Sequence, residues 1–184
     1  MSRFQVHDEL TAPAASVPVL TGAAKASGGR LPNFLAVLAG SPAALRAYAR
    51  FSSELRGGRL SAATTERIGL AVAQHYASEP GLVLHQRRAR KLHLGGDELA
   101  RALRWDSADE REAALLRYLR SAIEQRGHVP IHLLEEAREA GWEDDELLEA
   151  IARVALEGFT AMVNEAGDIP VDGSNEQGNS LRAA

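Results

Sequence analysis

The stretch Glu66–Gly95, which reads ERIGLAVAQHYASEPGLVLHQRRARKLHLG, contains two helix-forming segments separated by a break at SEPG. The first segment is rich in apolar residues with helical spacing, and the second ends at a glycine pair. At the break, Ser78 is followed by Glu79 and Pro80, a combination typical of a helix start. Because the connection is short, the stretch predicts two consecutive helices that run antiparallel.

Signals for helix starts recur along the rest of the chain. Ser41 and Ser61 each precede an apolar helical pattern, and Ser107 with a glutamate three residues later forms a capping box. No convincing strand pattern and no repeat of fixed period is present. The sequence therefore predicts a single all-α domain of about eight helices over residues 1–170, followed by a flexible polar tail over residues 171–184.

The composition excludes several classes of function. The 184 residues carry a net charge of -4, which gives no general attraction to nucleic acid or to anionic lipid. No long apolar run is present, so we expect no membrane partner. The absence of cysteine excludes disulfides, thiolate metal sites and a resident thiol nucleophile. Together with an N-terminus that lacks a signal-peptide pattern, this composition predicts a cytoplasmic location.

From Glu66 onward, the chain resembles the carboxymuconolactone decarboxylase family, and within it the alkylhydroperoxidase D-like branch. That branch typically has a glutamate in an apolar helix, then a Cys-x-x-Cys pair, then a histidine four residues after the second cysteine. Glu66 and His85 fit the glutamate and the histidine, whereas Ser78 and Gly81 occupy the two cysteine positions. Flanking segments such as GRLPNFLAVLAG and FTAMVN extend the resemblance, which implies an alkylhydroperoxidase D-like helical bundle.

The resemblance also implies an oxidoreductase of the peroxidase or peroxiredoxin type that assembles as a homo-oligomer. In such a site a thiolate attacks the substrate, while the residues matching Glu66 and His85 move protons. A serine hydroxyl is a far weaker nucleophile and cannot pass through sulfenic acid or disulfide states. Three functions therefore stay open: a divergent oxidoreductase, a thiol-free acid–base enzyme acting on a small carboxylated lactone, and a non-catalytic binding scaffold.

Glu66 and His85 are the candidate catalytic pair, acting as a proton relay. Helical rise places them roughly 7 Å apart along the hairpin, a gap that a bent connection or a water molecule can close. The alternatives are a buried structural histidine and a glutamate tied to an arginine or a helix end. Since polar groups in apolar surroundings need hydrogen-bond partners, we predict that both face one partly enclosed pocket. Ser78 is either a helix cap or a nucleophile with His85 as its base, and the cap is favoured.

Three further residues are candidates for substrate binding. His75 and Tyr76 end the helix before the break, and Arg88 belongs to a basic run that is either a solvated face or a carboxylate-recognition site. His85 and His93 are eight residues apart, but further metal ligands at suitable distances are not evident. We therefore expect no metal and no cofactor, with a small molecule and further copies of the chain as partners.

Overall fold

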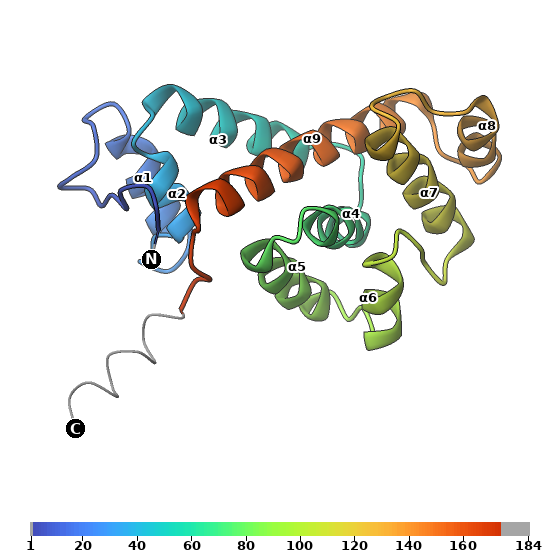
Figure 1. The fold of residues 1–184 in the computed structure, drawn as a ribbon, viewed down its shortest axis with the longest axis horizontal. Coiled ribbons are helices and arrows are strands. Elements are labelled where there is room, and N and C mark those ends of the chain that lie inside the picture. Colours follow the sequence, from blue (N-terminus) through green and yellow to red (C-terminus); the bar gives the residue numbers. More distant parts are fainter. Residues whose placement is uncertain (1, 174–184) are drawn as a thin grey trace. The chain divides into compact units, whose positions relative to one another are not determined.

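The computed structural model describes residues 2–173, and all the regular elements in this range are helices (Figure 1). This confirms the predicted all-α class, although nine helices are found where about eight were predicted. The tail predicted over residues 171–184 lies mostly outside the described residues. The helices are α1 (Val17–Ala26), α2 (Asn33–Leu38), α3 (Pro42–Arg56), α4 (Ala62–His75), α5 (Glu79–Lys91), α6 (Gly96–Ala102), α7 (Glu110–Glu124), α8 (Ile131–Glu139) and α9 (Asp144–Gly167).

The chain divides into two compact units. The first comprises residues up to 54 together with those from 162 onward, and it includes α1, α2 and most of α3. The second comprises residues 55–161 and includes α4 to α8 with most of α9. All the candidate site residues named above belong to the second unit. The organisation as a single domain stays a prediction.

Two of the predicted helix caps are confirmed. The Ser41 hydroxyl accepts a hydrogen bond from the Ala44 amide at 3.3 Å, at the start of α3. The Ser61 hydroxyl accepts from the Thr64 amide at 3.0 Å, at the start of α4. Each bond satisfies an amide that has no partner within its helix, and such caps typically contribute about 1 kcal/mol.

The predicted capping box at Ser107 is wrong. Asp109 caps α7 instead, and its carboxylate accepts from the amides of Arg111 at 2.9 Å and Glu112 at 3.4 Å. The Ser107 hydroxyl donates to the Glu98 carboxylate of α6 at 2.5 Å. The same hydroxyl accepts from the Asp109 amide at 3.1 Å, so Ser107 joins α6 to the loop before α7 and does not cap that helix.

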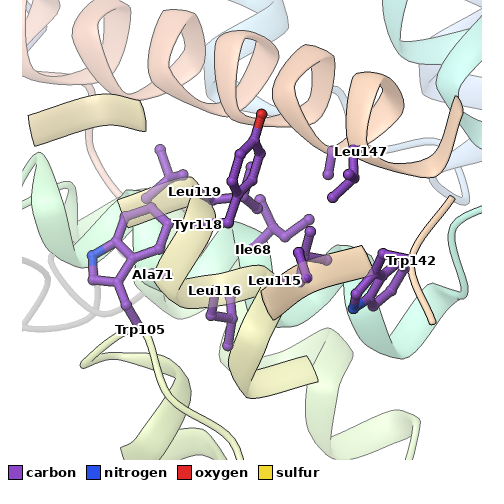
Figure 2. Close-up of a cluster of buried hydrophobic side chains, with 12 residues drawn as sticks. Ile68, Ala71, Trp105, Leu115, Leu116, Tyr118, Leu119, Trp142 and Leu147 are labelled. Carbon is purple, nitrogen blue, oxygen red and sulfur yellow. The ribbon is translucent and has the colours of Figure 1, made fainter. Parts of the chain in front are cut away.

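The core of the second unit is an apolar cluster formed mainly by α4 and α7. Ile68 of α4 packs with Leu115 and Leu119 of α7, and none of the three side chains is accessible to solvent. Figure 2 shows these side chains with Trp105 and Trp142 on opposite sides of the cluster. Burying each of the aliphatic side chains contributes roughly 1.5–3 kcal/mol, so α4 is held firmly in the centre of this unit.

A smaller cluster fixes α5 against α4. It joins Leu70 of α4, Ala89 of α5, and Leu99 and Ala102 of α6. The two helices are neighbours in Figure 1, where both are drawn in green. This packing places one face of α5 against the part of α4 that carries Glu66.

Candidate functional site

A tight turn joins α4 to α5. Ala77 adopts a left-handed backbone conformation with φ 54°, and the Ser78 amide donates to the Ala73 carbonyl at 2.8 Å. This hydrogen bond is characteristic of a Schellman ending, in which a left-handed residue closes a helix. The turn reverses the chain within three residues, so α5 folds back along α4 as the sequence predicts.

Glu66 and His85 meet directly across this hairpin. The Glu66 carboxylate lies 2.7 Å from the imidazole Nδ1, and the two residues are only 7% and 3% exposed. The predicted contact is therefore confirmed, but the predicted offset was too large. Residues 76–78 form the turn and do not extend either helix, so Glu66 is nine residues before the end of α4 and His85 is six after the start of α5. The offset is then about 4.5 Å along the helices, which the side chains span.

The other imidazole nitrogen contacts a residue that the sequence analysis missed. His85 Nε2 lies 3.2 Å from the Glu157 carboxylate of α9, and the second oxygen of Glu157 accepts from Arg153 Nη1 at 3.3 Å. A signal for both residues was present, because Arg153 and Glu157 are four positions apart in an otherwise apolar part of α9. We call the four side chains of Glu66, His85, Glu157 and Arg153 the relay network.

Gly69 explains how the imidazole fits against α4. A Cβ atom at this position would overlap the His85 ring. Glycine in the middle of a helix usually costs about 1 kcal/mol relative to alanine. Gly69 lies about one turn after Glu66 on α4, and its missing side chain leaves the space that the imidazole occupies. Gly69 is therefore part of the site although it carries no functional group.

We predict that Gly69→Ala destabilises the protein by about 1–3 kcal/mol, because the added methyl group must displace His85 or one of the two helices. Urea unfolding measures the change. Gly22 of α1 is the matched control, since it is also a mid-helix glycine but has no atom within 4 Å of the position of an added Cβ. Gly22→Ala should stabilise by up to about 1 kcal/mol. Equal gains in stability from both substitutions would show that Gly69 does not make room for His85.

The carboxylates determine the charge of His85. Burial alone would lower the pKa of the imidazole, but the negative charge of Glu157 and the hydrogen bonds to Glu157 and Glu66 outweigh burial and raise the pKa of His85 to about 9. At neutral pH both ring nitrogens therefore carry a proton, and each donates to a carboxylate. His85 is a proton donor in this state rather than a base.

The relay network is balanced in charge. It contains two carboxylates, one imidazolium and one guanidinium, and each of these side chains is at most 12% exposed. Burial acts to raise the pKa of Glu157, but the charge of His85 and, after it, that of Arg153 lower this pKa below the usual value. Charge balance allows four ionic groups to be buried together without an uncompensated charge.

A second polar cluster fixes the helix that carries Glu66. Arg67 of α4 pairs with Glu98 of α6 at 2.6 Å and lies 3.7 Å from Glu112 of α7. Glu112 also accepts from the Thr64 hydroxyl at 2.7 Å. Burial raises the pKa of Glu112, against the opposing effects of Thr64 and Arg67. These contacts tie α4 to two neighbouring helices and so fix the position of Glu66.

Ser78 and Gly81 lie side by side at the start of α5. A Cβ atom on Gly81 would lie 3.4 Å from the Ser78 hydroxyl oxygen and 3.6 Å from its Cβ. Ser78 occupies the N-cap position as predicted, but its buried hydroxyl accepts no capping bond from α5, so the predicted side-chain cap is wrong. The hydroxyl lies beside Gly81 instead. Both nitrogens of His85 are engaged by carboxylates, which argues against His85 as a base for Ser78.

The predicted substrate-binding residues lie in different surroundings. The Tyr76 ring packs against Gly158, the residue that follows Glu157. His75 is exposed and lies near two aromatic rings, with its ring centroid 5.2 Å from that of Tyr76 and 6.3 Å from that of Trp105. Arg88 is exposed on α5 and makes no ion pair within residues 2–173. Only Tyr76 is thus placed beside the relay network, and a role in substrate binding stays a prediction for all three.

The described residues lack two features, a membrane-spanning helix and a cluster of metal ligands. None of their helices combines the length and the apolar character needed to cross a membrane. They also contain no group of three or more histidine, cysteine or acidic residues arranged to hold a metal ion.

Glu66 and His85 both lie in a segment that matches a known protein family. Residues 42–125, which include both, match the model of the carboxymuconolactone decarboxylase family. The predicted resemblance is therefore confirmed. Among curated proteins, none matches the chain significantly in sequence.

Solved structures at 18–19% identity show the fold. A peroxidase-related protein with an alkylhydroperoxidase AhpD core from Ralstonia eutropha JMP134 matches with a TM-score of 0.82 and 19% identity, over 94% of this chain and 93% of its own. A peroxidase-related protein from Silicibacter sp. TM1040 matches with a TM-score of 0.77 and 18% identity, over 93% of this chain and 91% of its own. The debrominase Bmp8 in complex with 2,3,4-tribromopyrrole matches with a TM-score of 0.70 and 18% identity, over 85% of this chain and 84% of its own. The chain therefore has the AhpD-like helical fold.

Proposed function

We propose that this carboxymuconolactone decarboxylase family protein is a thiol-free enzyme that transfers a proton to a small carboxylated substrate of the lactone type. The observation that carries the proposal is the position of His85, whose two ring nitrogens each contact a buried carboxylate. A protonated imidazole held between two carboxylates can release a proton on one side and regain it on the other. This chemistry requires no sulfur.

Decarboxylation of an unsaturated lactone acid would use the relay network in a simple way. The bond between the ring carbon and its carboxylate breaks, carbon dioxide leaves, and the electron pair moves into the conjugated lactone as an enolate. One proton must then be added at carbon. It comes from His85 Nε2 and passes through Glu157, the most exposed carboxylate of the network at 12%. A proton from water, entering through Glu66, restores the imidazolium.

Two other functions are less well supported. A peroxidase-type oxidoreductase is the function that the resemblance implies, but the chain has no thiol to react with peroxide. A non-catalytic scaffold that binds a small molecule is the second candidate, and the nearly closed, charge-balanced relay network favours it, because such a network can also be purely structural. For all three functions we propose a cytoplasmic homo-oligomer. The exposed apolar side chains of Leu148 and Ile151 on α9 support the assembly.

The test is turnover of a γ-carboxylated butenolide, followed as release of carbon dioxide and as incorporation of deuterium from heavy water. We expect turnover by the native chain and a loss of at least about 100-fold in Glu157→Gln, because general acid catalysis contributes about that much. Glu124→Gln is the matched control, since Glu124 also pairs with an arginine four residues away but is exposed. Binding of the butenolide without turnover or deuterium exchange would instead support the scaffold.

A further inference from the structure

We infer that Arg153 anchors the carboxylate of the substrate, through the edge of its guanidinium that faces away from Glu157. The inference rests on the proposed function and adds the residue that selects the substrate. Arg153 is 7% exposed, and among the described residues its one side-chain hydrogen bond runs from Nη1 to Glu157 at 3.3 Å. Its Nε is fully enclosed and has no hydrogen-bond acceptor.

The unused donors of Arg153 have the geometry that a carboxylate requires. In a guanidinium, the Nε and Nη2 hydrogens point in the same direction along one edge, while Nη1 lies on the opposite side. Within residues 2–173, neither Nε nor Nη2 donates to an acceptor. This edge forms two parallel hydrogen bonds to the two oxygens of a carboxylate, the strongest arrangement that arginine makes with an anion.

An unpaired buried donor is costly, which makes Nε informative. Leaving such a group without an acceptor costs about 1–3 kcal/mol, and nearly all buried polar groups in proteins are paired. Glu157 already holds the guanidinium in place through Nη1. A disordered side chain therefore does not explain why Nε has no acceptor. A ligand oxygen that reaches this edge after a small rotation of Arg153 would recover that cost.

The location of Arg153 connects anchoring to proton transfer. Its guanidinium and His85 contact opposite oxygens of the same Glu157 carboxylate. A substrate held on the free edge of Arg153 is therefore next to the group that would deliver the proton. Its negative charge would also raise the proton affinity of Glu157, which favours transfer from His85.

Arg153 is better placed for carboxylate recognition than Arg88, the arginine that the sequence suggested. Arg88 is exposed on α5, where water and salt screen its charge. Arg153 is enclosed, and a charge-assisted hydrogen bond is stronger where water is excluded. The buried arginine is accordingly the better anchor, although it lies 65 residues further along the chain.

The experiment uses the full chain and one probe, the γ-carboxylated butenolide, with its uncharged amide as the comparison ligand. Nitrogen-resolved NMR follows the Nε–H signal of Arg153 during titration, and calorimetry gives the dissociation constants. We expect the acid to shift this signal and the amide to leave it unchanged. Affinity for the acid should fall at least tenfold in Arg153→Met and by an intermediate factor in Arg153→Lys, which keeps the charge but cannot form two parallel bonds.

Arg120→Met is the matched control, because Arg120 pairs with Glu124 at the same spacing on an exposed helix face. It should bind the acid as the native chain does. The inference is overturned if the native chain does not bind the acid, if binding leaves the Arg153 signal unmoved, or if Arg153→Lys binds as tightly as the native chain. Should Arg153→Met fail to fold, the native titration and Arg153→Lys still decide. Arg153-dependent binding without any turnover would reject the proposed function and leave this inference standing.

Discussion

Replacing His85 with asparagine is expected to destabilise the protein by about 3–5 kcal/mol at pH 7, the cost of breaking a buried ion pair from one side. Asparagine is neutral and too short to reach both Glu66 and Glu157, which flank the imidazole on either side. Glu157 keeps Arg153 as a partner, whereas Glu66 loses the counter-charge that His85 supplies. Urea unfolding followed by circular dichroism measures the change.

Two controls separate this effect from a general loss of packing. His128→Asn, at an exposed histidine, should change stability by less than about 0.5 kcal/mol. Adding Glu66→Gln to His85→Asn should restore about 1–3 kcal/mol, because the carboxylate that was left uncompensated is then neutral. Additive losses in the double variant would show that Glu66 and His85 do not interact energetically.

The same substitution should remove a specific pH dependence of stability. Since the pKa of His85 is raised to about 9 in the folded protein, its stabilisation is fully present below the unfolded value of about 6.5 and is lost as the pH rises through 9. The native chain should therefore lose about 3 kcal/mol over this range in excess of His85→Asn. If the difference in stability between the two proteins does not change between pH 6 and pH 10, His85 is not held as a buried cation.

The second large effect is a gain of redox activity in Ser78→Cys/Gly81→Cys. The native chain should show no peroxidase activity with a dithiol donor, because it has no cysteine. In the double variant, the Cβ atoms would lie 3.6 Å apart, within the range of about 3.5–4.5 Å found in disulfides. We expect a disulfide to form under oxidation and peroxide consumption with dithiothreitol to rise well above that of the native chain.

The single variants Ser78→Cys and Gly81→Cys provide the comparison, since neither can form the internal disulfide. A Cβ on Gly81 would lie 3.0 Å from that of Ala73, so adding Ala73→Gly relieves the crowding if the double variant is unstable. A double variant that forms the disulfide but consumes no peroxide would show that the surroundings no longer support thiol chemistry. Peroxidase activity in the native, cysteine-free chain would contradict the claim that this reaction requires a thiol.

Sequence reasoning went furthest where the contacts are local. The hairpin of α4 and α5, the caps at Ser41 and Ser61, and the contact between Glu66 and His85 all follow from residues within about twenty positions of one another. Propensity and spacing act on this scale, so a single sequence carries the information. The residue pattern that indicated the family lies within the same range.

The sequence alone did not predict the features that depend on tertiary packing. Glu157 is 72 positions from His85, and nothing in the spacing of either residue predicts that α9 lies against α5 at this point. The role of Gly69 depends on where the imidazole ring lies. Ser107 fits a capping box, but Glu98 of another helix binds its hydroxyl. Glu157 is distant in the chain, whereas the partners of Gly69 and Ser107 lie within twenty positions, but all three contacts depend on how the helices pack.

The central claim is that His85 is a protonated, two-sided donor between Glu66 and Glu157. Nitrogen-resolved NMR of the imidazole tests it most directly, because the chemical shifts of Nδ1 and Nε2 report separately whether each nitrogen carries a proton. The account predicts two protonated nitrogens at pH 7, a single titration with a pKa near 9, and a lower pKa in Glu157→Gln. An imidazole with one unprotonated nitrogen at pH 7 in the native chain would contradict it.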